Sequence, residues 1–348
     1  MSFSIKDFSF KDNSKVFMIA ELSANHNQSF DTAVKTIIAA KKSGADAIKI
    51  QTYTPDTITL NCKNDNFKIT RGIWDGMYLY DLYKEAYTPW DWQPELKRIA
   101  EGEGLIFFST PFDLTAVDLL ESMDVPAYKI ASFEIFDIPL IEYVAKKQKP
   151  VIISTGLAEI EDIELALKTC REAGNDQIAL LKCTSSYPAP VEEANLLTIP
   201  DMAERFKTIV GLSDHTIGDA VPIASVALGA RIIEKHFIID RKIGGPDSTF
   251  SMEPEEFRKM VDTIRNVEKS LGKVEYTLTD DARKTKEHSR SLFVVKDVNM
   301  GEKFTTENIK SIRPGYGLHP KFYKEILGKK SKVDLKTGTP LNWQYIQI

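Results

Sequence analysis

Short apolar runs recur along the chain, and nearly every one ends in a polar residue able to do chemistry. The runs and their polar residues are 16–20 with Glu21, 47–50 with Lys49 and Gln51, 105–108 with Ser109 and Thr110, 127–131 with Lys129 and Ser132, 151–153 with Ser154 and Thr155, 178–181 with Lys182, Thr184 and Ser185, 211–215 with His215, and 232–236 with His236. A (β/α)8 barrel needs such strands, because its active site lies at the carboxyl ends of the strands. The pattern therefore predicts an enzyme and the location of its site.

Segments of helical period separate the apolar runs. Residues 30–43 carry apolar side chains on one side and are followed by Gly44, a helix stop signal. Residues 113–122, 159–173 and 221–228 repeat the scheme. Strand followed by helix, about eight times, predicts an α/β fold with a parallel sheet. A doubly wound open sheet is the alternative, but no glycine-rich dinucleotide turn follows the first strand.

Two segments depart from this alternation. Residues 61–92 are rich in aromatic side chains and too long for a simple connector, so they form either a lid at the barrel rim or a peripheral helix packed on the outer surface. Residues 276–288 are polar and charged, which indicates a linker. We therefore expect a catalytic barrel over residues 1–275 and a small, mostly β domain over residues 289–348.

The bulk composition favours a soluble cytoplasmic protein. Lys and Arg number 45 against 50 Asp and Glu, which argues against nucleic acid as the main partner. The three cysteines, Cys62, Cys170 and Cys183, show no paired spacing, which fits a reduced compartment better than a disulfide framework. Neither a signal peptide nor a membrane-spanning run is evident in the sequence.

Four lysines lie at the predicted strand ends, together with several hydroxyl side chains. The lysines are Lys49, Lys129, Lys182 and Lys235, and the hydroxyls are those of Ser109, Ser132, Ser154, Thr184 and Ser213. An unpaired buried charge is costly, so these lysines must bind an anion or pair with neighbouring acids such as Glu134 and Glu234. A phosphate or carboxylate ligand accounts for the whole group.

His215 and His236 end the last two apolar runs. Residues two apart in a strand share a face, so Ser213 points with His215, and Glu234 points with His236. Two imidazoles that meet at the barrel mouth suit a divalent transition metal, with coordination positions left for water or substrate. Mn²⁺ is favoured over structural zinc because no protein carboxylate completes the set. The alternative is that each histidine is a hydrogen-bonded structural residue.

Glu21 follows the first apolar run. Its carboxylate could act as a general base or orient a water molecule beside a cation and an aldehyde. Capping of the next helix is the alternative role.

At these positions the chain resembles the sialic acid synthase family. The segments that carry the resemblance are 19–26 (IAELSANH), 44–52 (GADAIKIQT), 109–112 (STPF), 128–132 (YKIAS), 153–156 (ISTG), 211–215 (GLSDH), 234–236 (EKH) and 290–292 (RSL). Three further segments, 21–26, 51–56 (QTYTPD) and the insertion containing GIWD and YTPW, narrow the resemblance to one branch of the family.

The resemblance implies a metal-dependent condensation of phosphoenolpyruvate with an open-chain amino sugar, which gives a nine-carbon 2-keto acid and phosphate by C–O cleavage. It implies that the metal, Mn²⁺ or else Mg²⁺ or Co²⁺, is held by His215 and His236. The residues implied for phosphoenolpyruvate are Lys49, Lys129, Ser132, Ser154, Ser185 and Ser213, and those implied for the sugar are Gln51, Glu134, Tyr187 and Asp247. Ser185 stands where the N-acetylneuraminate branch usually has asparagine, a departure that bears on one expected hydrogen bond.

The C-terminal segment resembles the antifreeze-like (SAF) domain attached to these synthases. Arg313, in RPGYG, matches an arginine that reaches into the partner subunit's barrel and holds the acyl group of the sugar. The resemblance therefore implies a domain-swapped homodimer with shared sites, in which Arg313 joins Glu21 and the two histidines as a catalytic residue.

Two other functions remain open from the residues alone. A Schiff-base aldolase could use Lys49, Lys129 or Lys235, and borohydride with pyruvate would trap it. A non-catalytic sugar- or ice-binding protein would leave the polar strand ends unexplained.

Overall fold

The computed structural model describes residues 3–10 and 15–347. The chain divides into two compact units, Met1–Gly272 and Lys273–Ile348. Within the described part of the chain, no helix is long and apolar enough to cross a membrane. Cys62, Cys170 and Cys183 are free thiols.

The first unit is a closed barrel of eight parallel strands in the order β10-β3-β4-β5-β6-β7-β8-β9, which confirms the predicted (β/α)8 fold. The strands are β3 (Phe17–Glu21), β4 (Ala47–Thr52), β5 (Ile106–Pro111), β6 (Tyr128–Ile130), β7 (Val151–Ser154), β8 (Ile178–Cys183), β9 (Ile209–Asp214) and β10 (Ile232–His236). Each matches one predicted apolar run. Closure pairs His236 of the last strand with Glu21 of the first.

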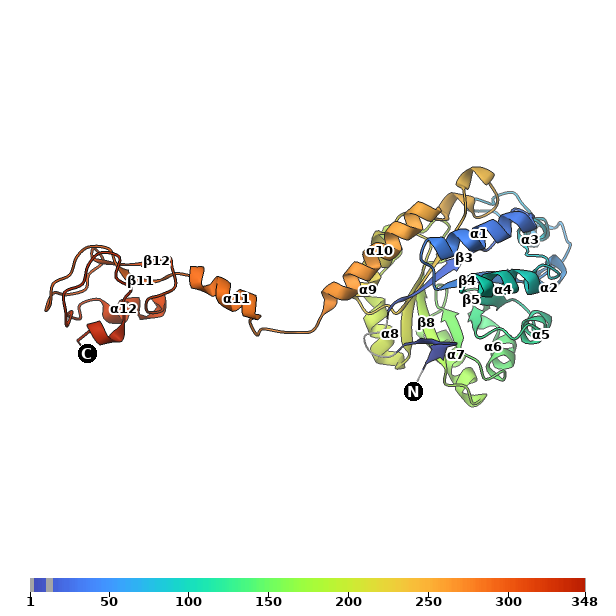
Figure 1. Cartoon of the computed structure of the whole chain (residues 1–348). Coiled ribbons are helices and arrows are strands. Elements are labelled where there is room, and N and C mark those ends of the chain that lie inside the picture. The colour runs from blue at the N-terminus through green and yellow to red at the C-terminus, as the bar shows by residue number, and fades with distance from the viewer. Residues whose placement is uncertain (1–2, 11–14, 348) are drawn as a thin grey trace. The chain divides into compact units, whose positions relative to one another are not determined.

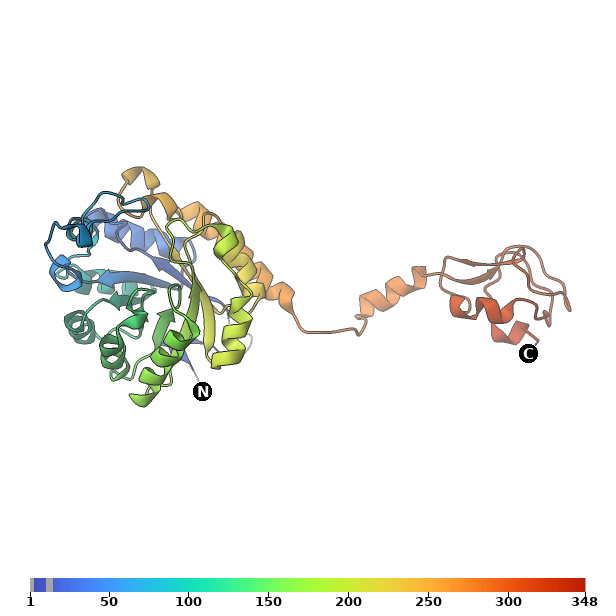
Figure 2. The same cartoon turned by 180° about the vertical axis from the view of Figure 1, so that it is seen from behind.

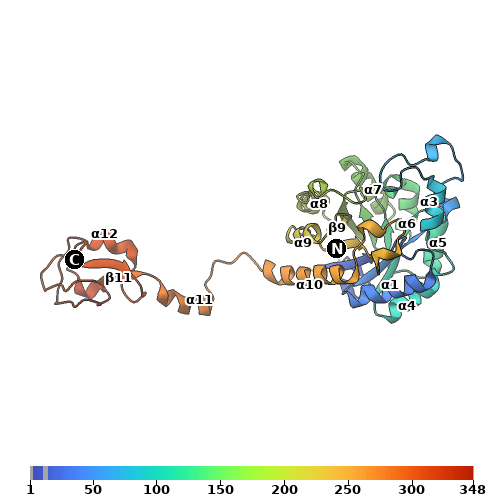
Figure 3. The same cartoon turned by 90° about the horizontal axis from the view of Figure 1, so that it is seen from above.

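Helices pack around the outside of these strands, as Figures 1 and 2 show from opposite sides. They are α1 (Phe30–Lys42), α2 (Pro55–Ile58), α3 (Leu79–Ala86), α4 (Gln93–Gly102), α5 (Leu114–Ser122), α6 (Ile138–Ala145), α7 (Ile160–Glu172), α8 (Thr198–Phe206), α9 (Ala220–Ala227) and α10 (Pro254–Leu271). In the view from above, α1, α4 and α10 lie outside the strands (Figure 3). Their apolar faces and the outward-pointing residues of the strands form the main core.

A hairpin of two short strands, β1 (Ser4–Ile5) and β2 (Phe8–Ser9), closes the amino-terminal end of the barrel. Phe3, Ile5 and Phe10 pack with the lowest apolar residues of the barrel lumen. The ring of Phe8 lies 4.6 Å from that of Phe17, the first residue of β3. This end of the lumen is thus filled with apolar side chains.

The insertion, residues 61–92, combines both structures considered for it. Its rear half contains α3, and Trp92 packs against Phe30 of α1 with ring centroids 5.7 Å apart. Its front half forms a hairpin in which Lys68 pairs with Tyr78. The tip of that hairpin reaches the barrel rim, because Trp74 contacts the loop that follows β8.

The second unit carries α11 (Asp280–Thr285), β11 (Ser291–Val294), β12 (Ile309–Ile312) and α12 (Tyr323–Ile326). Helix α11 lies inside the segment predicted as a linker, where Thr279 caps its first turn. The unit agrees with the expected small, β-rich module: β11 and β12 pair antiparallel, and residues 297–303 and 334–340 form turns with isolated bridges. A small core around Leu292, Phe304 and Ile326 holds the unit together without long strands.

Candidate active site

The site lies in the upper half of the barrel lumen. Residues that alternate along each strand face inward, and those nearest the carboxyl ends are polar and almost all buried. They are Glu21, Lys49, Gln51, Thr110, Lys129, Ser154, Cys183, Ser213, His215, Glu234 and His236. The barrel thus brings together side chains from all eight of its strands, β3 to β10.

Two lysines and two glutamates form a buried ionic cluster. The Lys49 Nζ lies 2.7 Å from Glu21 Oε2 and 3.5 Å from Glu234 Oε1. The Lys129 Nζ lies 3.9 Å from the same Glu234 oxygen and donates a 2.7 Å hydrogen bond to Ser154 Oγ. The charges balance in the absence of a ligand, which is how the interior tolerates them. An entering anion would compete with the glutamates for both ammonium groups.

Burial sets the protonation behaviour of this cluster. Burial raises the pKa of Glu21 to about 7, although Lys49 opposes the shift. Burial lowers the pKa of Lys129. For Glu234 burial acts upward, but Lys129 and Lys49 outweigh it, so the pKa of Glu234 is lowered and the carboxylate stays charged. Glu21 is therefore a carboxyl group able to exchange a proton near neutral pH.

Hydroxyl groups line the same side of the lumen. The Ser132 Oγ accepts a 3.1 Å hydrogen bond from the Gly156 backbone N–H. A Cβ atom on Gly156 would come within 2.3 Å of Ser185 Oγ and 2.8 Å of Ser132 Oγ, so both hydroxyls flank this glycine. The Ser213 Oγ donates to Glu234 Oε1 at 3.3 Å. Ser132 and Ser185 therefore lie together at Gly156, while Ser154 and Ser213 contact the ionic cluster.

His215 and His236 also meet, with ring centroids 5.4 Å apart. The Nδ1 of His215 lies 2.8 Å from the Thr184 carbonyl oxygen, and because that oxygen can only accept, Nδ1 carries the proton and Nε2 keeps a free lone pair. The Nδ1 of His236 is buried and has no hydrogen-bond partner. Burial and nearby positive groups hold the pKa of His236 well below its usual value, so this imidazole is neutral.

Cys183 lies against the first of these histidines, with its Sγ 3.8 Å from His215 Nδ1. Burial alone would raise the pKa of the thiol, but the imidazole and its hydrogen bond lower it to about 7. Burial likewise disfavours the charged form of His215, and the sulfur atom outweighs this and raises the pKa of His215. A thiol is thus part of the site.

These two imidazoles fit a divalent metal. One has a fixed tautomer with an available lone pair on Nε2, and the other has a buried Nδ1 without a hydrogen-bond partner, 3.8 Å from Asp247 Oδ2, so both rings can coordinate a cation. Among residues 3–10 and 15–347 no group of three or more His, Cys, Asp or Glu side chains is arranged to hold a metal. Water or substrate oxygens would therefore have to complete the coordination.

The predicted sugar-binding residues surround the histidines on the outer side. Gln51 Nε2 donates to Ser23 Oγ at 2.9 Å and to Glu21 Oε1 at 3.2 Å. The Ser23 Oγ donates in turn to Asp247 Oδ2 at 2.5 Å. The ring of Tyr187 lies 4.3 Å from that of His215. Gln51 therefore bonds directly to Glu21, and Tyr187 contacts His215. Asp247 is linked to Gln51 through the Ser23 hydroxyl.

Glu134 and Arg313 are the two remaining predicted site residues, and neither lies on a barrel strand. Glu134 begins a short 3-10 helix after β6, and burial raises its pKa to about 7 against the nearby charge of Lys129. Its Oε2 is buried without a hydrogen-bond partner, so it can receive a donor from a ligand. Arg313 is exposed and lies in the second unit. Its role remains a prediction.

Two of the four strand-end lysines point away from the lumen, which corrects the grouping made from sequence. Lys235 forms a buried ion pair with Asp214 on the neighbouring strand. Lys182 donates to the Cys183 carbonyl oxygen at 2.7 Å. Each lies one residue out of phase with an inward-facing neighbour, Glu234 or Cys183, and the period of two turns it toward the helices. They therefore belong to the walls of the barrel.

Sequence reasoning gave too small a role to several site residues. Glu234 was treated as a neighbouring acid, yet it contacts both inward lysines. Cys183 was considered only for its redox state. The same alternation that excludes Lys182 would have placed Cys183 in the lumen. Ser23 and Trp74 carry no comparable signal, because their contacts come from loops far apart in the chain.

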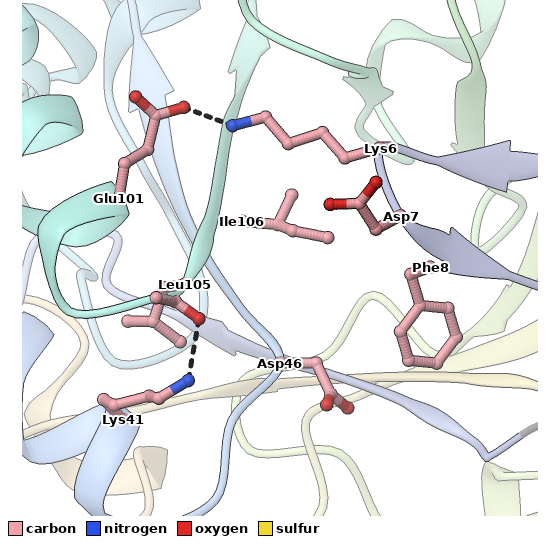
Figure 4. Close-up of a pocket in the computed structure, with 9 residues that line it drawn as sticks. Lys6, Asp7, Phe8, Lys41, Asp46, Glu101, Leu105 and Ile106 are labelled. Carbon is pink, nitrogen blue, oxygen red and sulfur yellow. Dashed lines mark hydrogen bonds and ion pairs between the residues drawn. The ribbon is translucent and has the colours of Figure 1, made fainter.

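A separate pocket of about 400 Å³ lies at the opposite, amino-terminal end of the barrel. Figure 4 shows Lys6 directed to Glu101 on one wall, and Lys41 paired on another. The Lys41 Nζ donates to the Gly104 carbonyl oxygen at 2.7 Å. Both ammonium groups are thus satisfied within the protein, and the polar strand ends lie at the other end of the lumen.

Comparison with known proteins matches both units. Residues 36–276 match the NeuB family, and residues 289–346 match the SAF domain. The pseudaminic acid synthase of Campylobacter jejuni is 48% identical over 332 residues, which cover 95% of this chain and 97% of that protein. The pseudaminic acid synthase of Helicobacter pylori is 48% identical over 93% of this chain and 96% of its own length.

Other relatives are more distant. The N,N'-diacetyllegionaminic acid synthase of Legionella pneumophila is 35% identical over 95% of this chain and 94% of that protein. Among solved structures, the N-acetylneuraminic acid synthetase of Leptospira borgpetersenii, in complex with citrate, has a TM-score of 0.73 at 30% identity. That match covers 82% of this chain and 95% of the solved one.

Proposed function

Since this chain belongs to the NeuB family of sialic acid synthases, we propose that it catalyses the pseudaminic acid synthase reaction. In this reaction phosphoenolpyruvate condenses with 2,4-diacetamido-2,4,6-trideoxy-L-altrose and water to give pseudaminic acid and phosphate. The observation that carries the proposal is the 48% identity to pseudaminic acid synthases over 95% of the chain, against 35% to a diacetyllegionaminic acid synthase. The family and the branch predicted from sequence are both confirmed.

In the proposed site, the inward lysines bind the two acidic groups of phosphoenolpyruvate. Lys49 and Lys129 are held less than 4 Å from Glu234 and are already desolvated, so little reorganisation accompanies anion binding. The hydroxyls of Ser132, Ser154, Ser185 and Ser213 supply short donors around them. In this arrangement the enol carbon faces the histidine side of the lumen.

His215 and His236 would hold the divalent metal. The metal would act as a Lewis acid toward the aldehyde oxygen of the amino sugar. Mn²⁺ is proposed because an ion with mostly oxygen ligands from water and substrate fits a site with only two protein nitrogens. Gln51, Tyr187, Asp247 and Glu134 would orient the sugar next to it.

Glu21 is the proposed proton acceptor. The enol carbon of phosphoenolpyruvate attacks the aldehyde carbon, and a positive centre develops at C2. Glu21 takes one proton from the water that adds there and passes it to the oxygen of the former aldehyde. The tetrahedral intermediate then expels phosphate through cleavage of its C–O bond, and the second proton of the water leaves with the phosphate. Lys49, 2.7 Å from the carboxylate, would hold Glu21 in place for this step.

Arg313 and the SAF domain supply the last part of the proposal. By family resemblance, Arg313 reaches the barrel of a second copy and holds an acyl group of the sugar. This arrangement requires a homodimer. Its support is the match of residues 289–346 to the SAF domain and the exposed position of the Arg313 side chain.

The test is the reaction in ¹⁸O-water with both substrates and Mn²⁺. We expect phosphate release that depends on both substrates, with label in the keto acid. Label in phosphate would refute C–O cleavage. Treatment with a chelator should remove the activity and Mn²⁺ should restore it, whereas borohydride with pyruvate should leave the chain unmodified. Covalent trapping would instead support a Schiff-base aldolase.

A further inference from the structure

Residues 68–78, in the first half of the insertion, form a small hairpin with Trp74 at its tip. The Ile69 backbone N–H donates to the Met77 carbonyl oxygen at 2.8 Å, and Gly76 donates to Ile69 at 2.9 Å. Gly72 and Gly76 have positive φ values of 81° and 89°, which make the turn tight. The tip residues around Trp74 are exposed, while the indole itself is half-buried.

Trp74 is half-buried because it bridges two loops of the barrel rim. Its Nε1–H donates a 3.1 Å hydrogen bond to the carbonyl oxygen of Pro246, the residue before Asp247. Its ring lies 5.6 Å from that of Tyr187, in the loop after β8. Tyr187 in turn contacts Phe250 at 5.4 Å and His215 at 4.3 Å. The hairpin tip is therefore tied to both loops that carry proposed sugar-binding residues.

The contacts of Trp74 fall on one side of the site. Tyr187 and Asp247 lie beside the histidines, whereas Lys129 and Ser154 lie on β6 and β7. Three aromatic rings, those of Trp74, Tyr187 and Phe250, form a continuous apolar wall on the sugar side. The faces of these rings bind C–H and methyl groups well.

From this geometry we infer that Trp74 is a positioning and specificity-determining residue for the amino sugar. The inference rests on the proposed function. Trp74 fixes Tyr187 and the Asp247 loop, and through them it sets the affinity for the sugar while leaving phosphoenolpyruvate binding unaffected. If the Trp74 ring only covered the surface, its removal would not change the KM for the sugar more than the KM for phosphoenolpyruvate.

The experiment compares Trp74→Ala and Trp74→Phe with the wild type. Trp90→Phe is the matched control, since Trp90 lies in the same insertion and its Nε1–H makes a similar 3.0 Å bond to the Tyr53 carbonyl oxygen. KM for 2,4-diacetamido-2,4,6-trideoxy-L-altrose and for phosphoenolpyruvate is measured by phosphate release. For Trp74→Ala we expect the sugar KM to rise on the order of 30-fold, from loss of the hydrogen bond and the ring contact. For Trp74→Phe, which loses only the hydrogen bond, we expect about fivefold.

The KM for phosphoenolpyruvate should stay within about twofold in every variant, and Trp90→Phe should leave both constants within that range. A sugar KM for Trp74→Ala within twofold of the wild type overturns the inference. A parallel rise in both constants overturns it as well, because it indicates general loss of structure. A wild type without phosphate release would instead refute the proposed function itself.

Limited trypsin digestion gives a second readout that needs no activity. Lys68 and Arg71 lie in the hairpin, and cleavage there requires it to leave the rim. Trp74→Ala should be cut at these residues several times faster than the wild type and Trp90→Phe, with an unchanged thermal unfolding midpoint. Equal cleavage rates would show that Trp74 does not hold the hairpin, and would overturn the inference.

Discussion

The two halves of the barrel lumen are built by the same strands and have opposite chemistry. The lower half is apolar and comprises Phe17, Ile19, Ala47, Phe108, Ala127, Ile152, Ala179, Leu181 and Ile232. The upper half holds the ionic cluster, the serines and the histidine pair. The change takes a single step of two residues on a strand, as from Ile19 to Glu21 or from Ala47 to Lys49.

The lower half makes the upper half chemically unusual. Apolar side chains beneath the site and the phenylalanine cluster at the amino-terminal end keep water out from below. Charges above them interact in a medium of low polarity, where their mutual effects are larger than in water. The same low polarity disfavours the charged form of each group. Burial is therefore the largest influence on the pKa of Glu21, Lys129 and Glu234. The apolar lower half of the lumen therefore helps to set the protonation behaviour of the catalytic residues above it.

The largest effect should follow from removing the histidine pair at the top. His215→Ala and His236→Ala should each lower kcat/KM on the order of 10³-fold and abolish reactivation by Mn²⁺ after chelation. Calorimetric titration with Mn²⁺ measures binding separately from activity. His26→Gln is the control, since His26 is also buried but bonds to Gln28 N and Thr88. Mn²⁺ reactivation that persists in both alanine variants would remove the pair from the site.

A change in the lower half should affect stability and leave the chemistry alone. Phe17→Ala removes a fully buried ring and should cost about 3 to 4 kcal/mol of unfolding free energy, measured in urea. At 25 °C its kcat/KM should stay within about twofold of the wild type. The matched control is Phe8→Ala in the same ring cluster, where the ring is only half-buried and the loss should be clearly smaller. Equal losses would contradict the proposed role of the lower half.

The smallest effect concerns the pH profile. With a pKa of about 7, Glu21 is protonated below neutral pH, so kcat/KM should rise with pH and level off above about 7. Glu21→Gln should lack this rise and be slower on the order of 10²-fold at pH 8. Glu134 also has a pKa of about 7, so Glu134→Gln is the control and should keep the rise. Loss of the rise in that variant would assign it to Glu134.

Local pattern predicted much of this molecule. The apolar runs became the eight barrel strands, and the helical segments became α1, α5, α7 and α9 within a residue or two. Polar residues at the strand ends indicated the site because carboxyl ends of parallel strands meet at one edge. The errors were also local: Lys182 and Lys235 were grouped with the inward lysines, although the period of two separates them from Cys183 and Glu234.

By itself, the sequence determined the barrel, the end of it that carries chemistry, and the family. The barrel and its chemical end follow from the spacing of apolar and polar residues along the chain, and the family follows from the resemblance of its motifs. Only the tertiary structure decided which polar groups meet: closure places His236 beside Glu21, and Glu234 between Lys49 and Lys129. It also brought Trp74 to the Pro246 carbonyl, 172 residues away. Such contacts depend on the path of whole loops through space, which periodicity in the sequence does not encode.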